Sequence, residues 1–418
     1  MPRIKIEGGH KLSGTISISG AKNSAVALIP AAILCDEEVT LNNVPNISDV
    51  DALESILIHL NADVRRTGES ISVNCKNVIN NKITEDMSVK LRASYYFMGA
   101  LLSKFKSVDM YFPGGCSIGS RPINLHLDGF KKLGATVIEE GNHFIIKADT
   151  LKGNEINLDF PSVGATINLI LAASKADGET IINNAAHEPE IVNVADLLNK
   201  MGAHIEGAGT SRIVISGVKY LHSAEEKVIP DRIEAGTYLI IGALLGKNLV
   251  INNLNSNHIM SLINKLEESG IPMGIKNNSI LVNTIDNKKA LNIKTEVFPG
   301  FVTDLQQPMA AYLTQCNGIS TIHETIYENR FQNLPELAKL GAKYEIKDNN
   351  RKAVIYGKTM LHGNEVIATD LRGGASVLIA ALVASGTTYI DDIHHILRGY
   401  EGIIDKLRNV GAKIEIVE

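Results

Sequence analysis

One short pattern recurs six times along the chain and divides its whole length into units of similar size. The end of an amphipathic helix is followed by Gly-Ala, or a close variant, and then by an alternating segment, as in Lys132-Leu133-Gly134-Ala135-Thr136-Val137. The central position falls at residues 61, 134, 202, 270, 341 and 411, at intervals of 68 to 73 residues. Glycine at five of these positions, and Asn61 at the first, are typical of a left-handed residue that ends a helix. The sequence therefore predicts six copies of one supersecondary unit.

Each unit also contains a helix that is apolar on nearly every face, which is typical of complete burial. The helix before each recurrent position is amphipathic, and short alternating segments predict three strands per unit. Because one flat sheet cannot shield six buried helices, we expect an α/β fold with two groups of three units, helices inside and sheets outside. The six apolar helices begin at Gly20-Ala21-Lys22-Asn23, Leu91-Arg92-Ala93-Ser94, Ser162-Val163-Gly164-Ala165, Ile233-Glu234-Ala235-Gly236, Thr303-Asp304-Leu305-Gln306 and Leu371-Arg372-Gly373-Gly374.

The two ends of the chain predict how the units are divided between domains. The sixth unit stops at Glu418, directly after its first closing strand, and residues 3–8 resemble the closing strand at residues 212–217. We therefore expect residues 1–20 and 230–418 to form a discontinuous C-terminal domain, and residues 21–229 to form an N-terminal domain. The cleft between two such domains is the expected ligand site.

Composition excludes several classes of protein. A length of 418 residues favours two domains, and a formal net charge of -5 argues against general attraction to nucleic acids or membranes. Four widely spaced cysteines indicate neither a disulfide framework nor a zinc site. The first residues lack the apolar core of a signal peptide, and no apolar run reads as a membrane span. We expect a cytoplasmic protein without a metal or cofactor and without an obligate protein partner.

Charged residues occur where the buried helices begin. Lys22, Arg92, Asp304 and Arg372 lie at such starts, and Arg121, Arg330 and Arg398 lie in loops leading into second helices. A helix N-terminus already favours anions, so cations there predict an anionic ligand between them. Structural alternatives remain open: Lys22 in a solvated cap, Arg398 paired with Glu401, and Asp304 as an ordinary N-cap.

The segment Pro113–Pro122 holds Cys116 among three glycines, with Arg121 five residues later. Glycine and proline at this density predict a loop, and a nearby guanidinium favours the thiolate of an exposed cysteine. The same guanidinium offers a planar fork for phosphate or carboxylate. The alternative is a surface loop with an incidental cysteine.

Together these segments resemble the UDP-N-acetylglucosamine enolpyruvyl transferase (1-carboxyvinyltransferase, MurA) family. The resemblance runs from residue 8 to the C-terminus. It is strongest at residues 20–23, 91–94, 113–122, 162–166, 230–238, 299–307, 328–331, 370–372 and 398–401. It implies the enolpyruvyl transferase fold, a two-domain inside-out α/β barrel. It also implies transfer of the enolpyruvyl group of phosphoenolpyruvate to the 3-hydroxyl of UDP-N-acetylglucosamine, with release of phosphate, in the first committed step of bacterial peptidoglycan synthesis.

The resemblance also implies roles for individual residues. Cys116 protonates the phosphoenolpyruvate methylene, carries a covalent adduct and is alkylated by fosfomycin, while Asp304 is the general base. Lys22, Arg121 and Arg398 grip phosphoenolpyruvate, with Arg92 and Arg372 in support. Asn23, Ile326 and Asp304 position the amino sugar. The uridine diphosphate is held by Arg121, Pro122, Ile123, Asn124 and Leu125 and by Ser162, Val163 and Gly164. Arg330 lies beside these residues in the substrate site.

The chain departs from the family pattern at three positions. Asn124 and Leu397 stand where the family usually or often has Asp, and Asn333 stands where His is common. These departures leave open a second, less active paralogue. The related synthase that uses shikimate 3-phosphate shares the fold but lacks the cysteine loop. A catalytically silent protein that binds nucleotide sugars is the alternative from a different class.

Overall fold

The structure is a computed structural model that describes residues 2–112 and 123–418. The chain divides into two compact units. The N-terminal unit contains residues 20–112 and 123–229, and the C-terminal unit combines residues 2–19 with residues 230–418. Each unit has its own hydrophobic core, formed by the buried faces of its helices and sheets.

The apolar helices predicted from the sequence are the buried helices of the two units. In the C-terminal unit all residues of α8 (Arg232–Leu245) are buried, as are all residues of α10 (Gln306–Leu313). A helix that is apolar on nearly every side is stable only when protein covers all of its faces, which explains the complete burial. The other buried helices are α12 (Leu371–Val383) of the same unit and α1 (Lys22–Ala31), α4 (Tyr96–Phe105) and α6 (Val163–Ala173) of the N-terminal unit.

Amphipathic helices lie outside these buried helices and turn one face to solvent. In α2 (Ser48–His59), for example, the apolar face is buried and Ile58 is exposed. The others are α5 (Asn124–Lys132), α7 (Pro189–Lys200), α9 (Met260–Glu268), α11 (Leu334–Lys339), α13 (His394–Leu397) and α14 (Ile403–Asn409), with α3 (Glu85–Lys90) as an additional short helix. Short 3₁₀ turns are η1 (Ala32–Leu34), η2 (Arg92–Tyr95), η3 (Ser256–Ile259) and η4 (Thr303–Leu305).

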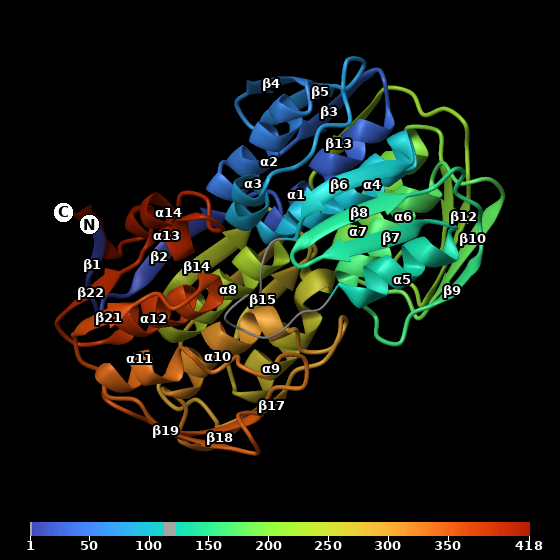
Figure 1. Cartoon of the computed structure of the whole chain (residues 1–418). Coiled ribbons are helices and arrows are strands. Elements are labelled where there is room, and N and C mark those ends of the chain that lie inside the picture. Colours follow the sequence, from blue (N-terminus) through green and yellow to red (C-terminus); the bar gives the residue numbers. More distant parts are fainter. Residues whose placement is uncertain (1, 113–122) are drawn as a thin grey trace. The chain divides into compact units, whose positions relative to one another are not determined.

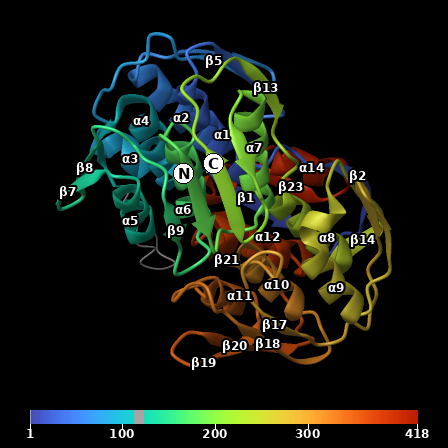
Figure 2. The same ribbon diagram turned by 90° about the vertical axis from the view of Figure 1, so that its right-hand side faces the viewer.

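Three sheets of the C-terminal unit surround its buried helices, and Figure 2 shows one of them, β17-β18-β20-β19, beside α10 and α11. Their strands, in spatial order, are as follows. The first sheet is β21 (Glu365–Ile367), β22 (Thr387–Asp391), β1 (Arg3–Glu7) and β23 (Lys413–Val417); the second is β15 (Met273–Lys276), β16 (Ser279–Val282), β14 (Gly246–Asn252) and β2 (Leu12–Ser17); the third is β17 (Asn292–Lys294), β18 (Gly318–His323), β20 (Lys352–Gly357) and β19 (Lys343–Lys347).

The described residues of the N-terminal unit form a matching set of sheets. These are β11 (His204–Glu206), β12 (Arg212–Ser216), β10 (Glu179–Asn183) and β9 (Glu155–Asn157); β13 (Ala224–Lys227), β3 (Glu38–Asn42), β5 (Ser70–Asn74) and β4 (Asp63–Thr67); and β6 (Ser107–Tyr111), β8 (His143–Lys147) and β7 (Thr136–Glu140).

The prediction of three strands per unit was incomplete. In five of the six sheets a further short strand pairs in parallel with the first strand of the unit, as β9 does with β10 and β21 with β22. Among the described residues, the sixth sheet has a single bridge at this place, between Ile83 and Met110. Several of these strands span three residues, which is too short for an alternating pattern to be visible in the sequence.

The first strand of the chain completes the sheet of the last repeat. β1 lies between β22 and β23 and pairs antiparallel with both, with Ile4 opposite Ile390 on one side and Ile416 on the other. Figure 1 shows the two ends of the chain close together at this sheet. The side chains of Ile4 and Ile6 are fully buried, so this strand is part of the core of its unit.

The six recurrent positions all end helices in the left-handed conformation, as predicted. Their φ angles range from 67° at Asn61 to 106° at Gly341. Most residues with a Cβ are strained at positive φ. Glycine adopts these angles freely, and asparagine adopts them more readily than other residues. Within the described residues, no helix combines the length and the apolar character that crossing a membrane requires.

Candidate active site

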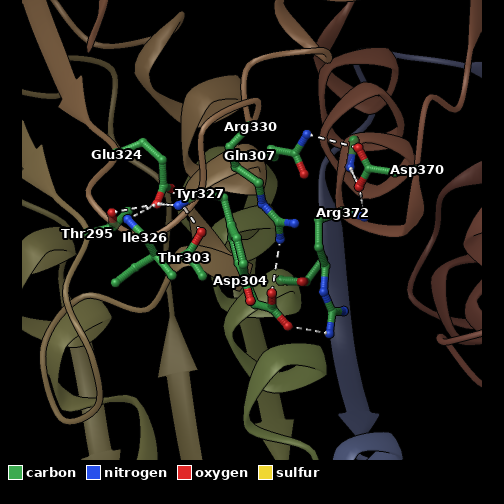
Figure 3. A network of polar contacts seen from close by, with 12 residues as sticks. Thr295, Thr303, Asp304, Gln307, Glu324, Ile326, Tyr327, Arg330, Asp370 and Arg372 are labelled. Carbon is green, nitrogen blue, oxygen red and sulfur yellow. Dashed lines mark hydrogen bonds and ion pairs between the residues drawn. The ribbon is translucent and has the colours of Figure 1, made fainter. Parts of the chain in front are cut away.

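A carboxylate held between two arginines lies at the start of α10 in the C-terminal unit (Figure 3). Asp304 lies in η4, directly before that helix, and its Oδ1 accepts a hydrogen bond from Arg330 Nη2 at 2.9 Å. Its Oδ2 accepts one from Arg372 Nη2 at 3.1 Å. The side chain of Asp304 is 30% exposed, whereas those of Arg330 and Arg372 are only 3% and 5% exposed. The cluster is thus anchored by buried guanidinium groups and open to ligands at the carboxylate.

Arg372 is fixed by a second set of contacts. Its Nη1 donates to the hydroxyl of Tyr400 at 3.0 Å, and that hydroxyl lies 3.0 Å from Thr237 Oγ1. Burial lowers the pKa of Arg372, but its contacts with Tyr400 and Asp304 outweigh burial and hold the pKa above its ordinary value. Burial raises the pKa of Tyr400, so the phenol is neutral at physiological pH. The cation therefore persists at this site despite its burial.

The backbone of Arg372 is fixed by the N-cap of α12. Asp370 Oδ1 accepts hydrogen bonds from the backbone N–H groups of Arg372 and Gly373 at 2.9 and 3.1 Å. Its Oδ2 accepts a third from Gln307 Nε2 at 3.1 Å, which links α12 to α10. An aspartate at this position satisfies free N–H groups of the first helical turn. The cap keeps the arginine at a helix start where its charge is otherwise unfavourable.

Lys22 also has a carboxylate partner, in the N-terminal unit. Its Nζ lies 2.8 Å from Asp49 Oδ2, and Asp49, in the first turn of α2, is 4% exposed. The charges of Lys22 and Arg372 were predicted to be tolerated because an anionic ligand lies between them. In the structure, the carboxylates of Asp49 and Asp304 balance part of the charge of Lys22 and Arg372. Lys22 is not in a solvated cap, because its side chain is only 12% exposed.

The remaining predicted residues of the N-terminal unit lie at helix starts. Asn23 lies in the first turn of α1 and is half-buried. Arg92 lies in η2, directly before α4, with its guanidinium 5.2 Å from the centre of the Phe112 ring. The first residues of α5 are also predicted ligands: Ile123 is the N-cap residue, Asn124 is exposed and Leu125 is half-buried.

Gly164 lies beside Ser162 and Val163 at the start of α6. Ser162 is the N-cap residue, and its Oγ accepts a hydrogen bond from Ala165 N at 3.3 Å. A Cβ at Gly164 would lie 2.9 Å from the hydroxyl of Tyr95 and 3.0 Å from His126 Cε1. A side chain at this position would therefore force Tyr95 or His126 to shift, a packing constraint that the sequence did not indicate.

In the C-terminal unit, Ile326 and Arg398 complete the set of described predicted residues. The backbone N–H of Ile326 donates to Glu324 Oε1 at 2.8 Å. Arg398 is the C-cap residue of α13 and is half-buried. Cys116, Arg121 and Pro122 lie outside the described residues. Among the described candidate residues, Asp304, Arg330 and Arg372 lie in direct contact.

Several polar residues around these sites were not predicted. Tyr400, Thr237, Asp370, Glu324 and Asp49 all contact a predicted residue or its neighbours. Tyr400 and Asp49 contact Arg372 and Lys22, which are distant in sequence, so only the tertiary fold brings these pairs together. Two signals were present: an acidic residue before a helix start for Asp370, and a glutamate at the end of a strand for Glu324. The described residues contain no group of three or more His, Cys, Asp or Glu that could hold a metal ion.

His126 is a buried structural residue beneath Gly164. Its Nδ1 lies 3.0 Å from Asn168 Nδ2, and Asn168 Oδ1 accepts a hydrogen bond from Gly99 N at 2.8 Å. Burial, with a smaller contribution from the charge of Arg92, lowers the pKa of His126 to about 3. The ring is therefore neutral and accepts a hydrogen bond from Asn168.

This burial predicts a loss of stability in mild acid. The unfolded chain binds a proton at His126 near its ordinary pKa of about 6.5, whereas the folded chain does not until about pH 3. The stabilising effect is complete above pH 6.5 and is lost as the pH falls. Between pH 7 and pH 5 the free energy of unfolding should decrease by about 2 kcal/mol more in the wild type than in His126→Gln. Urea unfolding at both pH values measures this, and parallel decreases in the two proteins would contradict it.

Comparison with known proteins identifies the family. The sequence profile of the EPSP synthase (3-phosphoshikimate 1-carboxyvinyltransferase) family matches residues 6–407. The chain belongs to this family. Within it, a Listeria monocytogenes serovar 1/2a protein named UDP-N-acetylglucosamine 1-carboxyvinyltransferase 2 is 49% identical over 412 residues, covering 99% of this chain and 97% of the relative. A Streptococcus pneumoniae (strain Hungary19A-6) protein named UDP-N-acetylglucosamine 1-carboxyvinyltransferase is 51% identical over 420 residues, covering 100% of both.

Solved structures of this family have the same fold. The enolpyruvyl transferase NikO from Streptomyces tendae matches with a TM-score of 0.90 at 26% identity, over 100% of this chain and 99% of that chain. An EPSP synthase from Acinetobacter baumannii matches with a TM-score of 0.76 at 16% identity, over 100% of both chains, and shows the fold alone. These similarities confirm the predicted α/β fold class and the resemblance to the UDP-N-acetylglucosamine enolpyruvyl transferases.

Proposed function

We propose that this protein transfers the enolpyruvyl group of phosphoenolpyruvate to the 3-hydroxyl of UDP-N-acetylglucosamine and releases phosphate. The observation that carries the choice of acceptor is the identity of about half of all residues, over the full length, to relatives named for this sugar nucleotide. The profile match alone does not separate this acceptor from shikimate 3-phosphate, because the family is named after the latter. In this role the protein acts in the cytoplasm, in the first committed step of peptidoglycan synthesis, without a cofactor.

The reaction needs a base at the hydroxyl and an acid at the methylene carbon. In the first step the oxygen of the sugar hydroxyl bonds to C2 of phosphoenolpyruvate. Asp304 accepts the proton of this hydroxyl, and Cys116 gives a proton to C3. In the second step the thiolate of Cys116 takes a proton back from C3 and the C2–O bond to phosphate breaks, which leaves the enol ether and free phosphate. Support for Asp304 comes from its partial exposure and from its two guanidinium partners, which hold the carboxylate in place.

The substrate phosphate and carboxylate require cations. Lys22, Arg121 and Arg398 bind phosphoenolpyruvate in this proposal, and Arg92 and Arg372 strengthen the same anion site. Positive charge develops at C2 during addition, and the cations act on the phosphate and carboxylate beside it, which they hold without having to move. The burial of Arg372 and its contacts with Tyr400 and the Asp370-capped helix supply such rigidity. An incoming anion competes with Asp304 for Arg372, which makes the carboxylate more available to the sugar hydroxyl.

The acceptor is bound by two further sets of residues in this proposal. Asn23, Ile326 and Asp304 position the amino sugar, and Arg330 orients Asp304 through the contact at 2.9 Å. The uridine diphosphate is held by residues 121–125 and 162–164. The N-terminus of α6 at Ser162 suits a diphosphate because its first N–H groups and the helix dipole favour anions.

Mass spectrometry of the reaction product tests the proposal. The purified protein is incubated with phosphoenolpyruvate and UDP-N-acetylglucosamine, with and without prior exposure to fosfomycin. The proposal expects a product heavier than the sugar nucleotide by one enolpyruvyl group, and loss of this product after fosfomycin treatment. A protein that binds the sugar nucleotide in calorimetry but forms no product would instead be a silent binding protein.

A further inference from the structure

A fully buried glutamate contacts the residue that precedes Asp304 and the segment that leads to Arg330. Glu324 directly follows β18 and has an exposed fraction of 0%. Its Oε1 accepts hydrogen bonds from Thr295 Oγ1 at 2.9 Å and from the backbone N–H groups of Ile326 and Tyr327 at 2.8 and 3.1 Å. Its Oε2 accepts one from Thr303 Oγ1 at 2.9 Å. These four donors match the acceptor capacity of a carboxylate.

The donors belong to two segments that carry candidate site residues. Thr303 precedes Asp304 in the chain, and the Ile326–Tyr327 backbone leads to Arg330. Because Arg330 contacts Asp304 at 2.9 Å, the contacts form a closed ring through Thr303, Asp304, Arg330 and back to Glu324. Figure 3 shows Thr303 and Asp304 between Glu324 and Arg372. The relative position of the two segments therefore depends on a side chain that does not reach the surface.

Other contacts hold the rest of this segment but do not link it to Asp304. The backbone N–H of Glu324 donates to Arg351 O at 2.8 Å, and Arg351 Nη1 donates to Tyr327 O at 3.0 Å. Both join the segment to the turn before β20. The contact of Glu324 with Thr303 ties the segment to the residue beside Asp304, in addition to the bond between Arg330 and Asp304 itself.

We propose that Glu324 is a positioning residue that sets the distance between Asp304 and the Ile326–Arg330 segment, and so determines how the acceptor is held. This inference rests on the proposed function, in which Asp304 and Ile326 position the sugar, whereas lysine and arginine side chains bind the two anionic groups of phosphoenolpyruvate. A displacement of about 1 Å of a reacting group can cost roughly a hundredfold in rate. Loss of the Glu324 contacts should thus affect the acceptor far more than phosphoenolpyruvate.

Three substitutions separate the reach of this side chain from its charge. Glu324→Gln keeps the length and can keep all four hydrogen bonds, because the Thr303 hydroxyl can accept from the new amide instead of donating. Glu324→Asp keeps the charge but is one methylene shorter, so it cannot reach all four donors. Glu324→Ala removes every contact. If position matters, Gln should behave like Glu, and Asp should behave like Ala.

Steady-state kinetics with both substrates tests this, together with calorimetry of UDP-N-acetylglucosamine binding. For Glu324→Ala and Glu324→Asp we expect kcat/KM for the acceptor to fall at least about tenfold, a weaker Kd for it, and an unchanged KM for phosphoenolpyruvate. Glu324→Gln should stay close to the wild type. Equal losses in Gln and Ala, or a KM for phosphoenolpyruvate that rises as much as the KM for the acceptor, would overturn the inference.

Glu336→Ala is the matched control. Glu336 is a second buried glutamate of the same unit, 8% exposed, and its Oε2 accepts from Ile367 N at 2.9 Å and from Lys339 Nζ at 2.8 Å. Its contacts do not include the Asp304 cluster. We expect a lower melting temperature with unchanged kcat/KM for both substrates. An acceptor defect in this control equal to that of Glu324→Ala would show a general effect of destabilisation and contradict the inference.

A second pair of variants decides the matter if the Glu324 variants do not fold. Thr303→Val removes the donor to Oε2, and Thr303→Ser keeps it. Only the valine variant should lose acceptor kcat/KM; equal kinetics in both would overturn the inference.

If the wild type does not use UDP-N-acetylglucosamine, the proposed function fails. The same series measured with shikimate 3-phosphate then tests the positioning role, which is lost if no variant separates the two substrates.

Discussion

Asp304→Asn should lower kcat by at least about a hundredfold, which is the lower range for loss of a general base. The amide cannot accept the proton of the sugar hydroxyl, although its shape is almost the same. Binding of UDP-N-acetylglucosamine should weaken less than turnover falls, because hydrogen bonds to the hydroxyl remain available. Single-turnover kinetics, with calorimetry of the sugar nucleotide, measures the two effects separately.

The same substitution should also reduce stability. Arg330 and Arg372 are nearly fully buried and both donate to Asp304, so an amide places its NH₂ group against one of the guanidiniums. Because the carboxylate is partly exposed, we expect a modest decrease of about 1–3 kcal/mol in the free energy of unfolding.

Asp405→Asn is the control for Asp304→Asn. Asp405 pairs with Arg408 at 3.0 Å, but its side chain is 75% exposed. Neither turnover nor stability should change measurably, since exposed ion pairs contribute little. Wild-type turnover in Asp304→Asn would remove the proposed base. A large loss of stability without any loss of kcat in the folded fraction would favour a purely structural role for Asp304.

Cys116→Ser should have the second largest effect. A serine hydroxyl is a much weaker acid than a thiol, so protonation of the phosphoenolpyruvate methylene should slow and kcat should fall by about a hundredfold or more. Calorimetry should show that the variant still binds UDP-N-acetylglucosamine. Undiminished turnover would remove the proposed acid role of Cys116.

Labelling by fosfomycin gives an independent measurement on the same variant. The other three cysteines are buried, and burial raises the pKa of Cys35, that of Cys75 to about 12 and that of Cys316 to about 11. Their thiolate fraction is therefore very small at neutral pH. Intact-mass spectrometry should show one label per chain in the wild type and none in Cys116→Ser. Persistent labelling of the variant would assign the reactive thiol to another residue.

Much of the fold could be predicted because local patterns repeat. The helix ends at Asn61 and the five recurrent glycines are marked by residues that tolerate a left-handed conformation, and each buried helix is marked by its apolar composition. The short parallel strands could not be predicted. A strand such as β9 or β21 exists because its neighbour offers hydrogen bonds, and three residues carry too little pattern to reveal it.

The candidate site was only partly accessible from the sequence for a similar reason. Asp304, Arg330 and Arg372 stand out as charges next to helix starts, and the structure brings them together; their catalytic roles stay predictions. The sequence left open that Asp304 is an N-cap, but α10 has Leu305 at that position, and Asp304 instead accepts from two arginines. Tyr400 and Glu324 reach the site from distant segments, and only tertiary structure reveals their contacts.

The choice of acceptor is tested most directly by phosphate release from phosphoenolpyruvate in two parallel reactions. One contains UDP-N-acetylglucosamine and the other shikimate 3-phosphate, with the same protein and buffer. We expect steady phosphate release only with the sugar nucleotide, and its loss after prior treatment with fosfomycin. Release only with shikimate 3-phosphate, or with neither acceptor, would contradict this expectation.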